Sequence, residues 1–290
     1  MNLDAVPAFP QRQETTHEST PGEPVISFED VTLGFGEDDV LRGVSFEVRP
    51  GETKALLGES GSGKTLILKL TAGLMRPDAG RIRVMGFDLA EMSEKELLDF
   101  RRQIGFVFQE GALFDSMTVA NNVAFRLHEE KVRKEEVEEK VRESLRFVEM
   151  EEAIDKFPAE LSGGMRRRVS IARALVDRPP LEIYDSPTAG LDPITAQTII
   201  LLILRLRDQV GSTALLATHR VQDVFGLANY RFDSGSNRAL RVAGNGEQPQ
   251  AHPTNVIVLR EGRIYFEGDT ERLRGSKDTY LKEFLASAQS

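Results

Sequence analysis

The chain has 290 residues, of which 40% are hydrophobic and 29% charged, so it carries enough apolar material for a buried core. It lacks cysteine, which excludes disulfides, thiolate nucleophiles and cysteine-ligated metal centres, and its four histidines do not have the spacing of metal ligands. The net charge of −9 argues against nucleic acid as a partner, and no apolar run approaches the roughly 20 residues of a membrane-spanning helix.

The first 24 residues are rich in proline, threonine, glutamate and glutamine and have no hydrophobic period, which predicts a disordered tail. This segment has neither the basic start nor the apolar stretch of a secretion signal, so we expect a cytoplasmic protein. Strand patterns at 25–35 and 40–48, with a turn at 36–39, then predict an antiparallel β start. A short buried strand at 54–58 runs into glycines, and a helix is expected from Lys64 to Arg76.

The middle and end of the chain alternate between strand and helix patterns. Strands are expected at 81–89, 104–109, 181–185 and 213–218, and helices at 93–102, 128–150 and 194–206. This order fits parallel strands joined by helices, and thus a mixed α/β fold. Residues 231–253 are rich in turn formers and predict an inserted loop with one candidate strand at 238–242. Two strands around Glu261–Gly262 and a helical tail over 275–290 complete the prediction.

A glycine-rich phosphate-loop pattern lies between the strand at 54–58 and the following helix. Its glycines let the backbone N–H groups turn inward, and the helix N-terminus adds positive partial charge, so an anion belongs there. Lys64 is expected to reach the β- and γ-phosphates, and the Thr65 hydroxyl to bind Mg²⁺. An ordinary glycine turn before a helix is the alternative. The pattern comprises Gly58, Glu59, Ser60, Gly61, Ser62, Gly63, Lys64 and Thr65.

Asp185, at the end of the strand at 181–185, is a second candidate ligand for the magnesium ion, with a structural turn residue as the alternative. A further motif, which precedes a basic helix, favours the metal-ligand interpretation of Asp185 over the structural one. It reads Leu161, Ser162, Gly163, Gly164 and Met165, and it resembles the signature of the ABC transporter ATPases. The resemblance covers about residues 25–274. It implies a P-loop NTPase fold of the ABC type, with an antiparallel β subdomain and a helical subdomain over about 110–175.

This resemblance assigns roles to further residues. Phe35 matches the aromatic that stacks on adenine, Gln109 the glutamine that links nucleotide and metal to the membrane subunit, and His219 the switch histidine. Each residue also has a purely structural interpretation: Phe35 as part of the core, Gln109 as a surface residue, and His219 as a hydrogen-bonded polar residue at a strand end. Ser162 also suits the cap of the helix that follows. A D-loop is expected at Ala189, Gly190, Leu191 and Asp192.

In this family the signature faces the nucleotide of the opposite subunit, so the resemblance implies a head-to-tail homodimer around two ATP molecules and their Mg²⁺ ions. The segment 106–125 and Met165, where glutamine is usual, look like the ATPase of Mla/Mce lipid-transport systems. That likeness implies phospholipid transport, a membrane permease, a lipid-binding Mla/Mce-type component and a peripheral place on the inner face of the cell membrane. The apolar stretch 111–119 is expected to dock the permease, unless Leu113 and Phe114 belong to the core.

One position departs from the family pattern. Ser186 stands where the family has a glutamate that polarises the attacking water, and Glu182 lies three residues earlier on the strand. Residues three apart on a strand point to opposite faces, so Glu182 cannot substitute. Hydrolysis is therefore in doubt, whereas nucleotide binding is expected. A hydrolysis-poor regulatory switch and a soluble ABC ATPase outside transport remain as alternatives.

Overall fold

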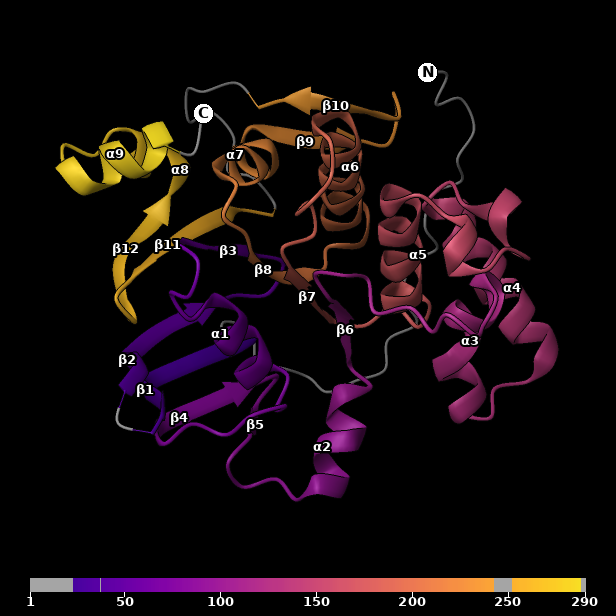
Figure 1. Ribbon diagram of the computed structural model, residues 1–290, viewed down its shortest axis with the longest axis horizontal. Coiled ribbons are helices and arrows are strands. Elements are labelled where there is room, and N and C mark those ends of the chain that lie inside the picture. Colours follow the sequence, from indigo (N-terminus) through magenta and orange to yellow (C-terminus); the bar gives the residue numbers. More distant parts are fainter. Residues whose placement is uncertain (1–22, 37, 243–251, 288–290) are drawn as a thin grey trace.

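The computed structural model describes residues 23–36, 38–242 and 252–287, and a six-stranded sheet runs across the molecule (Figure 1). The five strands from β11 to β6 are parallel, and β12 is antiparallel to β11. Strands β3, β7 and β8 are buried along their whole length, as strands covered on both faces are. The spatial order is β12 (Arg263–Asp269), β11 (Thr254–Arg260), β3 (Thr53–Gly58), β8 (Thr213–Ala217), β7 (Leu181–Asp185) and β6 (Ile104–Val107).

A four-stranded antiparallel sheet forms the second layer. Ile26 pairs with Val48 and Phe35 with Asp38, so the predicted turn at 36–39 is shorter than expected because pairing continues through Asp38 and Asp39. The Phe28 and Phe46 rings stack 4.6 Å apart on the inner face. In order across the sheet, the strands are β2 (Asp38–Val48), β1 (Ile26–Phe35), β4 (Ala79–Val84) and β5 (Phe87–Asp88).

The core lies in two parts, one on each face of the six-stranded sheet. Along β3, Leu56 belongs to the part shared with the antiparallel sheet and with α1 (Lys64–Thr71), whereas Ala55 and Leu57 belong to the other part. That second part is closed by α5 (Gly163–Leu175), α6 (Pro193–Val210) and α7 (Val221–Asn229). The alternation of side chains along each strand thus divides the core.

Helix α1 is shorter than the sequence predicts. It ends at Thr71, and Leu74, expected on its apolar face, is 46% exposed. Gly73 has φ +62°, a conformation that favours glycine and ends helices. A Cβ at Gly73 would also lie 2.8 Å from Leu97 Cδ2, in the neighbouring helix α2 (Glu94–Arg101).

The helical subdomain contains α3 (Val119–Glu129), α4 (Lys134–Phe147) and α5. The helix predicted between 128 and 150 is present as α4, but it starts later than expected, because the chain turns between α3 and α4, where Lys131 has φ +56°. Within α4 the expected apolar face is buried, and the expected pair Glu136–Lys140 is 3.2 Å apart. Two short 3₁₀ turns, Glu151–Ala153 and Pro158–Glu160, lead from α4 to α5.

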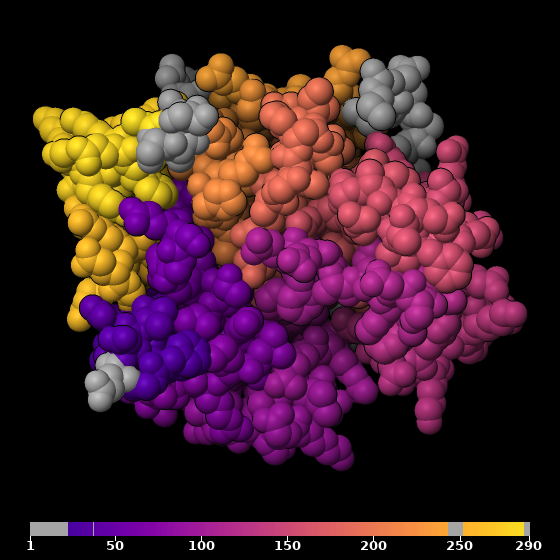
Figure 2. All heavy atoms as spheres, in the orientation of Figure 1, coloured from indigo at the N-terminus to yellow at the C-terminus, as the bar shows by residue number. Residues whose placement is uncertain are grey.

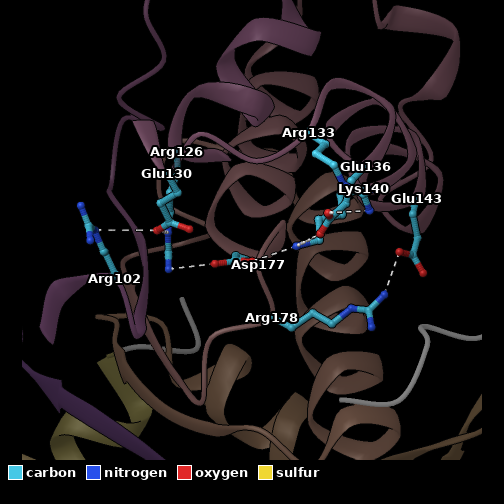
Figure 3. A network of polar contacts seen from close by, with 9 residues as sticks. All are labelled: Arg102, Arg126, Glu130, Arg133, Glu136, Lys140, Glu143, Asp177 and Arg178. Atoms are coloured by element: carbon cyan, nitrogen blue, oxygen red, sulfur yellow. Dashed lines mark hydrogen bonds and ion pairs between the residues drawn. The ribbon is translucent and has the colours of Figure 1, made fainter. Parts of the chain in front are cut away.

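A network of ion pairs ties this subdomain to the segment that leads into β7 (Figure 3). The Asp177 carboxylate lies 3.2 Å from Arg126 of α3 and 3.3 Å from Lys140 of α4. Its neighbour Arg178 lies 2.8 Å from Glu143 of α4. These pairs are partly exposed, so each contributes a modest free energy, but together they connect two helices to one short segment.

Within the predicted inserted loop at 231–253, the candidate strand at 238–242 is confirmed, and it pairs with a second strand that was not predicted. Tyr230–Asp233 (β9) pairs with Arg238–Arg241 (β10) in a hairpin, and the Phe232 backbone N–H donates to Asp208 of α6 at 2.6 Å. Residues 243–251 lie outside the described residues, as do residues 1–22 of the predicted tail. The chain then forms α8 (Thr270–Arg274) and α9 (Thr279–Ser287). None of the helices in the described ranges combines the length and apolar character that crossing a bilayer requires.

Candidate functional site

The phosphate loop (residues 58–65) joins β3 to α1 at the carboxyl edge of the parallel sheet. Gly58, Gly61 and Gly63 have φ of 152°, 80° and 99°, which L side chains rarely adopt. A Cβ at Gly58 would lie 2.6 Å from the Leu259 carbonyl oxygen, and one at Gly63 would collide with Leu41. Backbone shape therefore favours glycine at all three positions, and crowding also requires it at Gly58 and Gly63.

The Lys64 ammonium folds back into this loop. It donates to the carbonyl oxygens of Gly58 at 2.8 Å and Glu59 at 2.7 Å, and to Ser62 Oγ at 3.3 Å. Burial lowers the pKa of Lys64, while Asp185 and Glu59 act to raise it. The phosphate loop therefore holds the Lys64 ammonium at its centre, where the ammonium would contact a bound phosphate.

Asp185 and Thr65 come together at the end of β7. Thr65 Oγ1 lies 3.3 Å from Asp185 Oδ1, although 120 residues separate them, and the carboxylate is 7% exposed. A hydroxyl and a carboxylate oxygen at this spacing form a donor set of the kind that Mg²⁺ prefers, and they fit the predicted metal site. Gln109, predicted as a third ligand, is exposed.

Glu182 lies on the other face of β7. Its Oε2 accepts a 2.6 Å hydrogen bond from the Tyr184 hydroxyl, and both side chains are fully enclosed. Burial raises the pKa of Glu182 to about 7. This placement agrees with the strand alternation argument, since Asp185 faces α1 and Glu182 faces the opposite part of the core. Glu182 therefore has no access to a nucleotide on the phosphate loop.

Ser186 directly follows Asp185 with φ +47°, in the left-handed region. Its backbone N–H donates to the Ala217 carbonyl at 2.8 Å, and its hydroxyl lies 3.4 Å from Asp185 Oδ1. The side chain is half-buried next to the candidate metal ligands. A hydroxyl here can orient a water molecule, but it cannot act as a base near neutral pH.

His219 is exposed in the turn after β8, and a residue that sequence reasoning missed holds that turn. The Asp223 carboxylate of α7 accepts hydrogen bonds from Thr188 at 2.5 Å and from Thr218 at 2.9 Å. Burial raises the pKa of Asp223, and these hydrogen bonds lower it. One buried carboxylate thus joins the segment after Ser186 to the segment that carries His219. An acidic residue four positions after a histidine was the only available signal.

The signature residues begin α5. Ser162 caps the helix, since its hydroxyl accepts from the Met165 N–H at 3.2 Å, and Ser162 and Gly163 are exposed. Leu161 is buried and Met165 partly buried, which anchors the turn. A Cβ at Gly164 would collide with Thr195 of α6. The structure therefore leaves an exposed helix N-terminus at Ser162 and Gly163, a kind of site that binds anions.

The predicted D-loop packs beside these glycines in the same subunit. Leu191 Cδ2 lies 3.7 Å from where a Cβ on Gly163 would be. Asp192 caps α6 by accepting from the N–H groups of Ile194 and Thr195, both at 3.1 Å. Hydrogen bonding from the Thr195 side chain, and then from these N–H groups, holds the pKa of Asp192 below its ordinary value. Ala189 and the exposed Gly190 form the turn before it.

Phe35 is 57% exposed at the end of β1, so the core alternative is wrong for this ring. The Gln109 carbonyl oxygen accepts a hydrogen bond from the buried Arg167, whose guanidinium also donates to the Phe108 carbonyl at 2.5 Å. Arg167 belongs to the helix that the signature begins, and sequence reasoning missed it. It fixes the backbone at Gln109 relative to the signature helix.

In the apolar stretch at 111–119, the neighbours Leu113 and Phe114 differ in burial. Leu113 is partly buried against the core, which agrees with the core alternative, whereas Phe114 is 42% exposed. The Phe114 ring lies 4.7 Å from that of Phe125, which is 36% exposed. The buried Asn122 holds the loop through both the N–H and the carbonyl of Phe114, at 2.7 and 3.0 Å. The Arg173 guanidinium of α5 donates to the carbonyl of Ala112, two residues before Phe114, at 2.7 Å.

A cavity of about 670 Å³ adjoins the phosphate loop on the side of the antiparallel sheet. Residues 59–62 of the loop form one wall, and Asp39, Val40 and Arg42 of β2 form another, close to the end of β1 that carries Phe35. The turn between β11 and β12 and Tyr280 of α9 complete it.

Comparison with known proteins agrees with this architecture. A family model described as ABC transporter matches residues 41–189. The Mycobacterium leprae protein named "Probable ribonucleotide transport ATP-binding protein mkl" is 41% identical over 261 residues, which are 90% of this chain and 68% of that one. The Arabidopsis thaliana "Protein TRIGALACTOSYLDIACYLGLYCEROL 3, chloroplastic" is 35% identical over 273 residues, 91% of this chain and 74% of that one.

Solved structures give the same result. The dimeric ATP-binding cassette MJ0796 in a post-hydrolysis state, bound to ADP and Pi, superposes with a TM-score of 0.69 at 28% identity, covering 84% of this chain and 98% of that one. The cbiO1 protein of Clostridium perfringens, part of the ABC transporter complex cbiONQ, superposes with a TM-score of 0.73 at 28% identity, covering 90% and 95%. The chain belongs to the ABC transporter family, as one of its ATP-binding ATPase subunits.

Proposed function

We propose that this subunit binds Mg-ATP at the phosphate loop and uses it to drive lipid or phospholipid transport through a membrane permease. The observation that carries the proposal is the meeting of Thr65 and Asp185, 3.3 Å apart, beside a loop that holds Lys64 at its centre. Thr65 and Asp185 would hold the Mg²⁺ ion, which offsets phosphate charge when bound. The loop N–H groups and Lys64 would hold the phosphates.

Replacing Lys64 with Ala tests this site. The variant loses the charge partner of the phosphates, so ATP affinity should fall by about 2 kcal/mol or more, as for truncated buried charge pairs. Calorimetric titration with Mg-ATP measures this change. Lys69→Ala, on the same helix but outside the loop, is the matched control and should leave affinity unchanged. An unchanged affinity in Lys64→Ala would exclude the phosphate loop as the binding site.

We also propose a homodimer in which the N-terminus of α5, at Ser162 and Gly163, faces the nucleotide of the second copy. The exposure of both residues supports this, because nothing in the described part of the same chain covers them. A solved relative of the same fold is titled as dimeric with ADP and Pi bound. Nucleotide between two copies would bring the exposed His219 and the predicted D-loop into the joint site.

The permease is proposed to dock on the apolar stretch at 111–119. Its exposed Phe114–Phe125 pair is an apolar feature beside Gln109, and Asn122, Arg173 and Arg167 hold the loop to α3 and α5. Such a rigid apolar feature suits a helix of a membrane partner. It would place this subunit peripherally on the inner face of the cell membrane.

The lipid substrate rests on sequence likeness. The segment 106–125 and Met165 are similar to the ATPases of Mla/Mce systems, and one relative is named after a galactolipid, although another is named for ribonucleotide transport. Purification of the complex from native membranes, with identification of its subunits and bound lipid, tests the substrate class. A permease with an Mla/Mce-type component and phospholipid is the expected result; a permease without bound lipid, which carries ribonucleotides, would contradict it.

A hydrolysis-poor regulatory switch is the second candidate, and Ser186 is the observation that favours it. The two candidates share ATP binding and dimerisation, and they differ in turnover. Multiple-turnover ATPase assays on the complex with its permease separate them, since a transporter must turn over and a switch need not.

A further inference from the structure

The cavity beside the phosphate loop has one wall that comes from the C-terminal end of the chain. Tyr280 of α9 lines it together with residues 59–62 of the loop. Figure 2 shows the yellow C-terminal segment directly beside the indigo and purple atoms of the N-terminal third. The same cavity reaches β2 next to Phe35, so it lies along the path from the phosphate loop to the expected adenine position.

The Tyr280 ring is held firmly. The Arg260 guanidinium lies 4.1 Å from its centroid, the Tyr265 ring meets it edge-on at 5.0 Å, and the Phe284 ring lies 6.1 Å away. The helix that carries it is anchored by the buried side chains of Leu281 and Phe284. These neighbours pack against the ring, which leaves the hydroxyl as the polar group that Tyr280 can offer to the cavity it lines.

A second set of contacts fixes the start of α9. The Tyr265 hydroxyl donates to Asp278 at 2.9 Å, and another oxygen of the same carboxylate accepts from the Leu281 N–H at 2.9 Å. Within the described residues, no hydrogen bond joins the Tyr280 hydroxyl to another side chain. The fold thus presents a fixed and unpaired phenol to the cavity.

The charges around the cavity select the part of a nucleotide that fits there. Asp39, Glu59 and Glu261 contribute three carboxylates, against the two guanidiniums of Arg42 and Arg260. The Arg42 Nε donates to the Asp39 carbonyl at 3.0 Å. The Arg260 guanidinium is engaged by two tyrosine rings and lies 3.5 Å from Glu261. This surplus of negative charge disfavours phosphate and favours an uncharged hydroxyl-bearing group. Burial and the nearby Glu59 also raise the pKa of Tyr280, so the phenol remains a hydrogen-bond donor at neutral pH.

We propose that the Tyr280 hydroxyl hydrogen-bonds a ribose hydroxyl of the nucleotide on the phosphate loop, which makes α9 part of the nucleotide site. The inference rests on the proposed nucleotide binding at residues 58–65. It makes Tyr280 a specificity residue that distinguishes a nucleotide from a bare polyphosphate. Phosphates contact the loop and Lys64, and only the nucleoside reaches the cavity wall.

The test compares Tyr280→Phe with the unaltered protein in calorimetric titrations with ATP, inorganic tripolyphosphate, 2′-deoxy-ATP and 3′-deoxy-ATP. Loss of one hydrogen bond should weaken ATP binding about 3- to 10-fold. Tripolyphosphate affinity should stay unchanged, and the effect of the substitution should vanish with the deoxynucleotide that lacks the bonded hydroxyl. Tyr230→Phe is the matched control, because Tyr230 lies on β9 and is not among the residues that line the cavity, and it should leave the ratio of ATP affinity to tripolyphosphate affinity unchanged.

Three results would overturn the inference. The first is unchanged ATP affinity in Tyr280→Phe while Lys64→Ala still weakens it. The second is an equal loss for ATP and tripolyphosphate, which would mean that the substitution distorts the phosphate loop. The third is an effect that persists with both deoxynucleotides. Unchanged affinity in Lys64→Ala would instead refute the nucleotide site itself, and the proposal with it.

Discussion

Ser186 occupies a left-handed backbone position at which serine and unbranched side chains such as glutamate carry a similar strain. Replacing the serine with a longer side chain therefore adds no backbone cost. Its neighbours Asp185 and Thr65 remain in contact whichever side chain stands at 186, since their own contact does not involve it. A substitution at Ser186 is therefore expected to change nucleotide hydrolysis and to leave nucleotide binding intact.

We predict that Ser186→Glu raises the ATPase rate by at least ~10-fold, a cautious part of the 10²–10⁴-fold that general-base assistance contributes. Steady-state phosphate release measures the rate, and Ser186→Gln, which adds length without a base, serves as the control. Equal rates in the unaltered protein and the Glu variant would mean that another group orients the water. Glu182 is not a candidate for that group, because it faces the opposite side of β7.

Glu182 predicts a dependence of stability on pH. Its pKa is about 7 in the folded protein and near 4.5 when exposed, so the folded state binds the extra proton between these values. Stability from this group is full below about pH 4.5 and falls as the pH rises through 7, by up to ~3 kcal/mol. Urea unfolding at pH 5 and pH 8 measures the difference. Glu182→Gln should reduce this pH dependence, and an identical slope in both proteins would contradict the assignment.

At the scale of elements, the loop at 110–119 shows how a buried polar side chain positions an apolar surface. Asn122 is fully buried, and its side-chain amide makes four hydrogen bonds to the loop backbone, two of them to Phe114. Such satisfied buried groups rigidify their surroundings. Leu113 packs inward and holds the loop, so its substitution would test folding and not docking.

We predict that Phe114→Glu releases the subunit from membranes while the isolated protein stays folded, because the ring is 42% exposed and a charge there needs no burial in the monomer. Sedimentation of membranes with immunodetection measures release, and circular dichroism reports the fold. Leu240→Glu, on the exposed β10, introduces the same charge far from α3 and should leave membrane association unchanged. Retention of Phe114→Glu on membranes would place the permease elsewhere.

At the scale of the whole molecule, the phosphate loop and the signature lie in different parts of the fold, the central sheet and the helical subdomain. The loop follows a strand of the central sheet, whereas the signature begins a helix of the subdomain held by the Asp177 network (Figures 1 and 3). A subunit with both features exposed can present each to a second copy, and a two-fold arrangement would satisfy both at once.

We predict that Gly163→Asp abolishes the ATP-dependent dimer without unfolding the monomer. There is room for a Cβ at Gly163, and a carboxylate in the first turn stabilises a helix while it repels phosphate. Light scattering with and without ATP measures the dimer, and calorimetry should show that each monomer still binds ATP at its own loop. A dimer that persists in the variant would mean that the signature face is not the interface.

The sequence by itself determined the parts of this site that are formed by contiguous residues. The glycines at 58, 61 and 63 have the positive φ angles that their spacing predicts, and Ser162 caps the helix it precedes. Such features depend on local backbone conformation, so they can be recognised in one dimension. The alternation on β7 likewise separated Asp185 from Glu182, because strand geometry alone fixes which face a residue takes.

Only the tertiary structure decided the contacts between distant segments. The meeting of Asp223 with Thr188 and Thr218, and of Tyr280 with the phosphate loop, depends on how separate elements pack, which no local pattern encodes. The end of α1 at Thr71 and the strand at 230–233 were missed for a related reason. Helix and strand boundaries there follow from the neighbours that each segment packs against, Leu97 in the first case and Asp208 in the second.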